Sequence, residues 1–416
     1  MSVVPDLKCR SCAKGGLELI LSLGQSPLAN ALLQAKDVPS AGGAPEETFP
    51  LDLAFCPSCS LLQITETVAP EKLFREYLYF SSFSDTMLQH AEAISNKLVE
   101  SEKLTKDSLV AEVASNDGYL LQYYQRRGIP VLGIEPAVNI AKVAQDERGI
   151  RSISEFFTRD LAEKLKADGE RADVIHANNV LAHVADLNGF VAGIEILLKD
   201  TGVAVIECPY AKDFIDHCEF DTIYHEHLCY YSLTALDHLA TRHGLVIRDV
   251  ERLPIHGGSL RLYLGKKGKT ERGPRTLALL AEEQAWGVGT LAFYQGFAAR
   301  VEKLKFALVG HLKALKAKGA KIAAYGAAAK GSTLLNYFGI GKETLDFVVD
   351  RSTHKQGLYM PGVHIPIVAP SRLLEAKPDY VLLLTWNFAA EILEQQKEYR
   401  EAGGKFIVPI PEVKTL

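Results

Sequence analysis

The densest group of chemically capable side chains is a short run, 220–228. It contains Tyr224, His225, Glu226 and His227 in succession. Together these supply a hydrogen-bond donor, an orienting acid and a base whose ordinary pKa lies near neutrality. Packing alone rarely requires such a run, so the sequence predicts acid–base chemistry here. A metal site on the two histidines is the weaker alternative, because no third ligand is evident.

Four of the seven cysteines form two Cys-x-x-Cys pairs near the N-terminus. Each pair can present two thiolates to one tetrahedral ion, so the pattern predicts a structural zinc ion. Disulfides would need an oxidising compartment, and a redox dithiol would need only one pair. Four thiolates leave no open position, so we do not expect this zinc to be catalytic. The predicted ligands are Cys9, Cys12, Cys56 and Cys59.

An apolar run, 109–113, leads into a loop of small and polar residues, a segment with helical spacing and a second apolar run. This order is typical of a strand–loop–helix–strand unit in a doubly wound sheet. A carboxylate that ends the second strand can bind a ribose diol, and Glu135 stands there. The single Gly118 and the acidic Glu112 and Asp117 disfavour a pyrophosphate and favour a sulfonium or ammonium group.

This loop resembles motif I of S-adenosylmethionine-dependent methyltransferases, with Ala114 at the position of the first glycine. An ordinary strand–helix–strand unit without a cofactor is the alternative. On the methyltransferase interpretation, the residues expected to bind the cofactor are Glu112, Ala114, Asn116, Asp117, Gly118, Glu135 and Pro136.

Two later strand ends are expected to complete this site. Phe157 follows a short strand at a point that often covers the adenine in this fold class, although core packing explains it equally well. The strand 172–177 ends in Asn178 and Asn179, and His183 follows closely. Ligands of open α/β sheets lie at the carboxyl ends of strands, so we expect all three residues where the cofactor and the substrate meet.

Two further segments suggest contact with a ligand. An aromatic segment that includes Tyr79 and Phe80 precedes the strand at 109–113. It could form a substrate wall, a lid or a packed domain junction. Tyr79 could donate a hydrogen bond, whereas Phe80 could not. Gly257 and Gly258 interrupt an apolar strand and predict close approach of the backbone to a ligand or another chain.

A second strand–loop–helix unit begins at 321–325. Its loop contains Lys330, Ser332 and Thr333 before a helix, which suits phosphate. The spacing departs from the P-loop pattern. Asp350 ends the next strand, where a ribose carboxylate would stand. The unit is a second dinucleotide site or a structural duplicate without a ligand.

Composition and charge exclude several classes of protein. The chain has 416 residues, 47% of them hydrophobic, and a net charge of −5, which suits a globular protein of two or three domains. This charge disfavours nucleic-acid binding. No apolar run is long enough to span a bilayer, and the N-terminus does not resemble a signal peptide. We therefore expect a cytoplasmic protein without nucleic-acid or membrane partners, and a monomer.

Five motifs, weak alone, are specific in their order and spacing. Together they resemble the C-methyltransferases that act on nucleotide-linked 4-keto-deoxysugars in antibiotic and surface-polysaccharide pathways, over nearly the whole chain. The motifs are Cys9-x-x-Cys12 with Cys56-Pro57-x-Cys59, Glu112-x-x-x-Asn116-Asp117-Gly118, Tyr224-x-Glu226-His227, His256-Gly257-Gly258 and Tyr325-Gly326-Ala327-x-x-Lys330.

The resemblance implies an α/β protein of three parts. They are a zinc-binding module at 1–75, a central Rossmann-like class I methyltransferase domain at 76–265, and a second Rossmann-like α/β domain at 266–416. The central domain would bind S-adenosylmethionine, and the C-terminal domain would bind the nucleotide sugar, with dTDP as the implied nucleotide.

The resemblance also implies residue roles. A base removes the proton next to the 4-keto group, and the enolate carbon attacks the methyl group of S-adenosylmethionine. His227 is the implied base, with Glu226, Tyr224, His183 and Tyr79 as further catalytic residues. Tyr224 or His183 would donate to the enolate oxygen. The implied substrate-binding residues are His256, Gly257, Gly258, Tyr325, Gly326, Lys330, Ser332, Thr333, Asp350 and Lys355.

Two hypotheses of other classes remain. The replacement of a motif glycine by Ala114 fits a zinc-binding protein whose methyltransferase-like domain is inactive. The second strand–loop–helix unit fits an NAD-linked sugar oxidoreductase.

Overall fold

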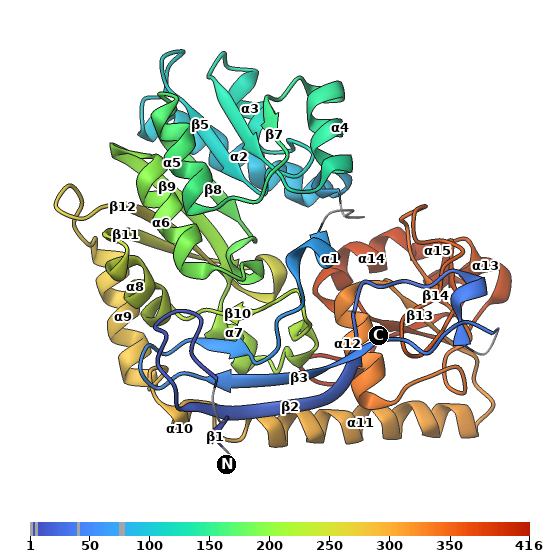
Figure 1. Cartoon of the computed structure of the whole chain (residues 1–416). Helices are drawn as coiled ribbons and strands as arrows, with labels where there is room; N and C mark the ends of the chain where they lie inside the picture. Colours follow the sequence, from blue (N-terminus) through green and yellow to red (C-terminus); the bar gives the residue numbers. More distant parts are fainter. Residues whose placement is uncertain (1–2, 5–6, 40–41, 75–79) are drawn as a thin grey trace.

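The computed structural model describes residues 3–4, 7–39, 42–74 and 80–416. These residues form three sheets with helices packed against them (Figure 1). The N-terminal sheet lies at the bottom of Figure 1, the central sheet at the upper left and the C-terminal sheet at the right. The predicted fold class, an N-terminal module followed by two Rossmann-like units, is confirmed.

The N-terminal sheet is antiparallel and takes one strand from the middle of the chain. Cys229 pairs with Gln63, and Tyr230 with Leu62, so this late strand follows the acid–base run directly. The run is thereby held against the N-terminal module. In sheet order the strands are β1 (Val3–Val4), β2 (Leu17–Pro27), β3 (Thr48–Phe55), β4 (Leu62–Ile64) and β10 (Cys229–Tyr230).

The central sheet is doubly wound. Its strands β5 to β9 are parallel and mostly buried, and for this reason they appear in the sequence as short apolar runs. The strand order reverses at β5, so a crevice opens between the ends of β5 and β8. In sheet order the strands are β11 (Leu245–Leu253), β12 (Ser259–Lys266), β9 (Leu198–Pro209), β8 (Ala172–Asn178), β5 (Val110–Val113), β6 (Val131–Ile134) and β7 (Ser152–Ile153).

The C-terminal sheet repeats this arrangement. Its strands are parallel except for the last, and the order reverses at β13. A second crevice therefore opens where β13 and β16 end. In sheet order the strands are β15 (Ile367–Val368), β14 (Val348–Val349), β13 (Ile322–Tyr325), β16 (Tyr380–Leu383), β17 (Lys405–Val408) and β18 (Lys414–Thr415).

Helices cover both doubly wound sheets. The helical region after residue 273 breaks at Gly287, which adopts a left-handed conformation (φ 76°) and ends the first helix. The helices of the first two parts are α1 (Pro70–Phe74), α2 (Asp85–Ser101), α3 (Leu121–Gln125), α4 (Val138–Arg148), α5 (Arg159–Ala167), α6 (Leu187–Leu197), α7 (Ala211–Asp216) and α8 (Leu233–Arg242). Those of the third are α9 (Pro274–Trp286), α10 (Leu291–Tyr294), α11 (Phe297–Ala317), α12 (Ala329–Phe338), α13 (Arg372–Ala376), α14 (Ala389–Gln395) and α15 (Lys397–Glu401).

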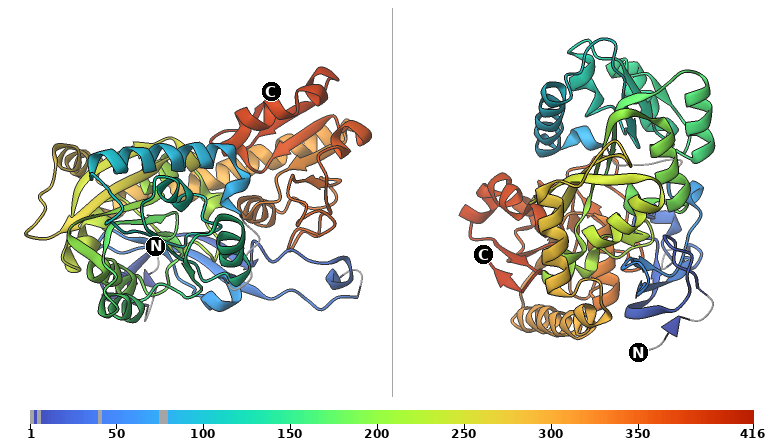
Figure 2. Two further views of the ribbon diagram at one scale, coloured as in Figure 1. Left: turned by 90° about the horizontal axis from the view of Figure 1, so that it is seen from above. Right: turned by 90° about the vertical axis from the view of Figure 1, so that its left-hand side faces the viewer.

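The segment between β2 and β3 reaches from the N-terminal sheet to the C-terminal domain (Figures 1 and 2). Leu33 bridges to Tyr359, and the backbone carbonyl of Ala29 accepts a 2.7 Å hydrogen bond from the Ser332 hydroxyl. The Glu46 carboxylate also accepts from the Gly362 N–H at 2.9 Å. These contacts join two domains that are far apart in the sequence.

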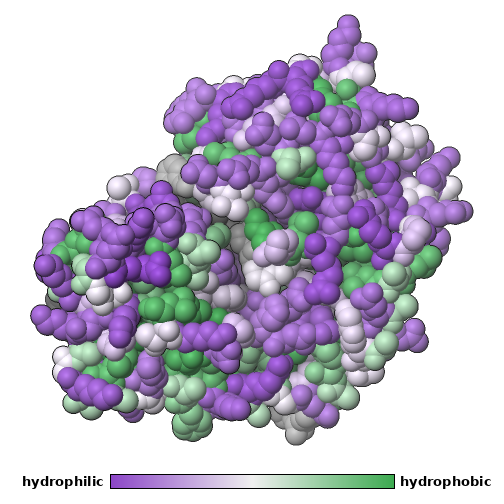
Figure 3. Space-filling view, turned by 180° about the vertical axis from the view of Figure 1, so that it is seen from behind, coloured by the Kyte–Doolittle hydropathy of each residue, from purple (hydrophilic) through white to green (hydrophobic). Residues whose placement is uncertain are grey.

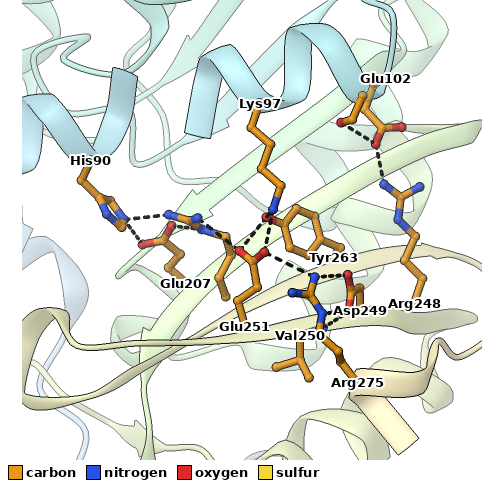
Figure 4. A network of polar contacts seen from close by, with 12 residues as sticks. His90, Lys97, Glu102, Glu207, Arg248, Asp249, Val250, Glu251, Tyr263 and Arg275 are labelled. Carbon is orange, nitrogen blue, oxygen red and sulfur yellow. Dashed lines mark hydrogen bonds and ion pairs between the residues drawn. The ribbon is translucent and has the colours of Figure 1, made fainter. Parts of the chain in front are cut away.

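A buried ion network holds α2 against the central sheet (Figure 4). The carboxylate of Glu207, which is 1% exposed, lies 2.8 Å from His90 Nε2 and 2.6 Å from Arg261 Nε. A buried carboxylate needs such partners to offset its lost hydration. Just before α2, the Ser81 N–H donates to Asn116 Oδ1 at 2.9 Å, so the start of this helix lies against the loop after β5.

The face of the molecule shown in Figure 3 is mostly hydrophilic. On the side opposite to Figure 1, hydrophilic residues predominate, and hydrophobic residues form small separate groups (Figure 3). Among the helices of the described residues, none has the length and apolarity that a membrane span requires.

Candidate active site and zinc site

The four predicted zinc ligands lie together at one end of the N-terminal sheet. Their sulfur atoms are all within 4.8 Å of one another, with 3.5 Å from Cys9 to Cys59 and 3.6 Å from Cys12 to Cys56. A tetrahedral ion with Zn–S bonds of about 2.3 Å needs sulfurs about 3.8 Å apart, so this cluster fits zinc. Each pair sits on a tight turn that passes through a left-handed residue, Ala13 (φ 59°) or Ser60 (φ 62°).

The acid–base run and both sheet crevices open into one cavity of about 840 Å³. Its walls combine the ends of β5, β6 and β8 with the loop after β2, the acid–base run and the start of α12. Of the residues predicted to bind or react, those that line it are Ala114, Asn116, Glu135, Pro136, Phe157, Asn178, Asn179, His183, Tyr224, Glu226, His227, Lys330 and Lys355.

The loop after β5 is shaped to receive a ligand. Ala114 (φ 54°) and Asn116 (φ 49°) adopt left-handed backbone conformations, as does Gly118 (φ 76°). Ala114 therefore keeps the conformation that a motif glycine would have, despite its side chain. Glu135 closes the loop, because its carboxylate accepts from the N–H groups of Asn116 at 2.9 Å and Ala137 at 2.8 Å.

Three predicted cofactor residues support this loop from beneath and do not line the cavity. Glu112 is 1% exposed, and burial, with Asp117 and Glu135 nearby, raises the pKa of its carboxyl group. Asp117 forms a 3.4 Å ion pair with Arg148. A side chain at Gly118 would collide with that of Ile150. Phe157 does line the cavity, and its ring packs edge-on against another phenylalanine of the wall.

Replacing Glu135 with glutamine is expected to weaken S-adenosylmethionine binding by at least about tenfold. One end of the amide cannot accept the backbone N–H bonds that shape the loop, and a ribose acceptor is lost. Isothermal titration calorimetry measures the change. Glu163→Gln, on an exposed face of α5, is the control, and equal affinities in the two variants would contradict the prediction.

The acid–base group is a hydrogen-bonded pair. His227 Nδ1 lies 2.9 Å from the carbonyl oxygen of Thr222, so this nitrogen carries the proton and donates it. Nε2 is then an acceptor, and the Tyr224 hydroxyl donates to it at 2.8 Å. The two rings overlap with centroids 4.0 Å apart. The local backbone therefore directs Nε2 of His227 at the Tyr224 hydroxyl.

His183 lies beside this pair and also lines the cavity. Its ring packs edge-on against His227, with centroids 4.7 Å apart. Burial lowers the pKa of His183 to about 4, although the nearby backbone carbonyls of Glu226 and Asn179 oppose this effect. His183 is therefore neutral at ordinary pH and can act as a hydrogen-bond partner but not as a charged acid.

Glu226 has a partner that no sequence pattern predicted. Oε1 of Glu226 accepts a 2.7 Å hydrogen bond from the side-chain amide of Asn30, which lies in the loop after β2 and also lines the cavity. Asn30 belongs to no motif in that loop, so the sequence contained no local signal for it.

His225 faces away from the cavity. Its Nε2 lies 3.1 Å from the Pro50 carbonyl, and its ring packs edge-on against Phe49 of the N-terminal sheet. Within the described ranges, the group found able to hold a metal is the cysteine cluster, which argues against a metal on His225 and His227.

The C-terminal domain contributes two lysines to the cavity. Lys330 Nζ is buried 4.7 Å above the Trp386 ring and has no hydrogen-bond partner among the described residues. Burial raises the pKa values of Glu219 and Asp221 to about 7 and about 6, and the charge of Lys330 opposes both shifts. Lys355 Nζ donates to a backbone carbonyl at 2.8 Å. An unpaired buried ammonium group is suited to an anionic ligand.

Several predicted substrate residues have protein partners instead. The Ser332 hydroxyl donates to the Ala29 carbonyl at 2.7 Å, and the Thr333 hydroxyl to the Ile223 carbonyl at 3.0 Å. Asp350 accepts from the backbone N–H of Ala327 at 2.8 Å, which repeats the role of Glu135 in the other sheet. Tyr325 and Gly326 do not line the cavity, and a side chain at Gly326 would collide with Thr385.

The backbone at Gly257 and Gly258 approaches protein side chains closely. A side chain at Gly257 would collide with the carboxylate of Glu219, and one at Gly258 with that of Asp213. The close approach predicted from the sequence is therefore internal. The backbone of His256 lies in the short helix η6 (Ile255–Gly257), but its side chain is outside the described residues, as is all of Tyr79.

Fold and site together define a class I S-adenosylmethionine-dependent methyltransferase with an added zinc module. Three family models match the chain in order: "Putative zinc binding domain" over residues 9–74, "Methyltransferase domain" over 88–250 and "C-methyltransferase C-terminal domain" over 254–411. The matched segments agree with the predicted cofactor, S-adenosylmethionine, and with the predicted zinc ion.

One relative matches the whole chain. The C-methyltransferase NovU of Streptomyces niveus is 36% identical over 415 residues, which is 100% of this chain and 98% of that protein. The chain therefore belongs to the family of C-methyltransferases that includes NovU.

Two further proteins match part of the chain. The ubiquinone biosynthesis O-methyltransferase of Bartonella quintana is 30% identical over 97 residues, which is 23% of this chain and 39% of that protein. Among solved structures, the PH0226 protein of Pyrococcus horikoshii matches with a TM-score of 0.37 and 14% identity, over 47% of this chain and 98% of its own.

Proposed function

We propose that the protein methylates the carbon next to the ketone of a nucleotide-linked 4-keto-deoxysugar, with dTDP as the nucleotide. The observation that carries the proposal is the shared cavity. The cofactor loop after β5, the Tyr224–His227 pair and the buried Lys330 all face it, so methyl donor, base and an anion-binding group surround one space. Membership of the C-methyltransferase family supports carbon as the methylated atom.

Each of the three predicted parts of the chain has its own proposed role. Residues 1–75 hold zinc, residues 76–265 bind the methyl donor and carry the acid–base run, and residues 266–416 bind the nucleotide. S-adenosylmethionine supplies an electrophilic methyl group when bound. Because Ala114, Asn116 and Glu135 line the cavity, their end of it is the proposed donor site. Phe157, Asn178 and Asn179 extend the same wall.

His227 is the proposed base. Its Nδ1–H is held by the Thr222 carbonyl, which leaves the lone pair of Nε2 to accept a proton. The Tyr224 hydroxyl already donates to that nitrogen, so the two side chains act as a unit on the C–H bond next to the ketone. The carbon left with the electron pair attacks the methyl group, and the ketone forms again. His183 is proposed to face the sugar across the cavity.

Lys330 is the proposed site for the diphosphate. Its buried ammonium group is unpaired in the described part of the chain, and Lys355 adds a second positive charge to the wall. Ser332, Thr333 and Asp350 are left out of this site, because none of them lines the cavity and the two hydroxyl groups donate to backbone carbonyls.

The test is incubation with S-adenosylmethionine and a panel of nucleotide-linked 4-keto-deoxysugars in heavy water, read by mass spectrometry. A gain of one methyl group on one sugar supports the proposal. Deuterium incorporation without methylation would support the base and reject that sugar as the methyl acceptor. Neither signal, with no cofactor bound, would contradict the proposal and favour an inactive zinc-binding protein. Oxidation of a sugar with reduction of NAD would favour the oxidoreductase.

Lys330→Met is expected to raise KM for the nucleotide sugar by at least about tenfold, with S-adenosylmethionine affinity unchanged. The substitution keeps the apolar contact with Trp386 and removes the charge that would bind the diphosphate. Steady-state kinetics measure KM. Lys342→Met is the matched control, because Lys342 also lies over an aromatic ring but outside the cavity. Equal KM values in the two variants would contradict the assignment.

A further inference from the structure

The two carboxylate oxygens of Glu226 have different surroundings. Oε1 accepts the 2.7 Å hydrogen bond from Asn30 Nδ2. Oε2 is buried and lacks a hydrogen-bond partner among the described residues. Glu226 is 5% exposed and lines the cavity. A buried carboxyl oxygen without a partner costs free energy, which a ligand that bonds to it would recover.

The N-terminal module determines where Asn30 lies. Asn30 follows β2 by three residues, and its carbonyl accepts from the Leu32 N–H at 2.9 Å in a tight turn. The flanking Ala29 carbonyl is bonded to Ser332, and Leu33 bridges to Tyr359. The turn is therefore held from both sides, by the N-terminal sheet and by the C-terminal domain.

We propose that Asn30 is a positioning residue that aims Glu226 at the substrate ketone. This inference rests on the proposed function. The amide N–H can only donate, so it requires Oε1 to accept, and the proton of the neutral acid must then be on Oε2. That O–H donates a hydrogen bond to the ketone oxygen as negative charge develops on it, and the proton stays on Glu226.

The neighbouring groups fit this role. Burial raises the pKa of Glu226 to about 7, while the Asn30 N–H and the charge of Lys355 lower it. A neutral acid is therefore available near pH 7. Tyr224 is already bonded to His227 Nε2, and the His183 ring is neutral. In this proposal Glu226 donates to the enolate oxygen, a role that the sequence resemblance implied for Tyr224 or His183.

The pH dependence has a defined sign. Activity needs the neutral form of Glu226, so kcat/KM falls as pH rises through its pKa. The Asn30 N–H favours the carboxylate, and its removal raises the pKa. The alkaline limb of the kcat/KM profile should move up by about 0.5 to 1 pH unit in Asn30→Ala, which corresponds to one hydrogen bond. Asn30→Asp, with a second carboxylate, should move it further in the same direction.

The experiment measures methyl transfer and deuterium exchange, against pH, with the panel sugar that the wild-type protein accepts. Asn30→Ala is expected to lower both rates about tenfold below the alkaline limb, because the acid loses its orientation. S-adenosylmethionine affinity should not change. Asn188→Ala is the matched control: its amide also links the N-terminal module to the central domain, through the Arg10 carbonyl at 2.8 Å, but lies outside the cavity.

The outcomes separate this inference from the proposed function. Slower exchange together with the shifted alkaline limb in both Asn30 variants supports the positioning role. Suppose that the wild-type protein methylates a panel sugar, but the Asn30 variants show the same reaction rates and the same alkaline limb of kcat/KM as Asn188→Ala. That result would overturn this inference and leave the proposed function intact. A rate loss without a shifted limb would also overturn it, because a merely structural role predicts that result. A wild-type protein that neither methylates nor exchanges any sugar would overturn both.

Discussion

His227→Ala is expected to lower the rate of methyl transfer by about 10²- to 10⁴-fold, the usual contribution of a positioned general base. Deuterium exchange should fall with it, because both depend on removal of the same proton. The loss should appear in kcat. S-adenosylmethionine affinity should remain, because Glu135 shapes the loop after β5 through the Asn116 N–H, whereas His227 bonds to Tyr224 and Thr222.

The matched control is His225→Gln. His225 belongs to the same run but donates toward Pro50 and does not line the cavity, and a glutamine amide can replace that hydrogen bond. Its rate should stay within about threefold of the wild-type rate. Partial recovery of His227→Ala by added imidazole would strengthen the assignment. Full activity in His227→Ala would contradict it and direct attention to Tyr224.

Cys56→Ser is expected to release the zinc ion and to destabilise the N-terminal module by several kcal/mol, because ligation and folding are coupled. Cys56 is fully buried in the hydrophobic core, so its loss reaches the strands around it. A loss of that size corresponds to a fall of roughly 10 °C in Tm. Metal analysis measures zinc per chain, and differential scanning calorimetry measures Tm.

Activity should fall with stability, because β4 pairs with β10 immediately after the acid–base run and the loop after β2 supplies Asn30. Cys218→Ser is the control, since Cys218 is a buried cysteine outside the cluster. It should keep a full complement of zinc. An unchanged zinc content in Cys56→Ser would contradict the four-cysteine site.

Some of these features were predictable because they are local in the sequence. The cysteine pairs need only tight turns to present their thiolates. The loop after β5 and Glu135 are joined by one strand–helix–strand unit, so their spacing determines their geometry. The same holds for Tyr224 and His227, which lie within one turn of backbone and form a hydrogen bond.

Other features were decided by packing between distant segments. Asn30 and Glu226 are 196 residues apart, and no periodicity relates them. Ser332 lies in a phosphate-like loop, yet its hydroxyl bonds to Ala29, 303 residues away. A side chain at Gly257 would collide with that of Glu219, 38 residues away in the sequence. Short-range patterns specify turns, strands and helices, because these arise from contacts between neighbours in the chain. The shared cavity and the partners of its polar atoms depend on how three sheets pack together, which only the tertiary structure decides.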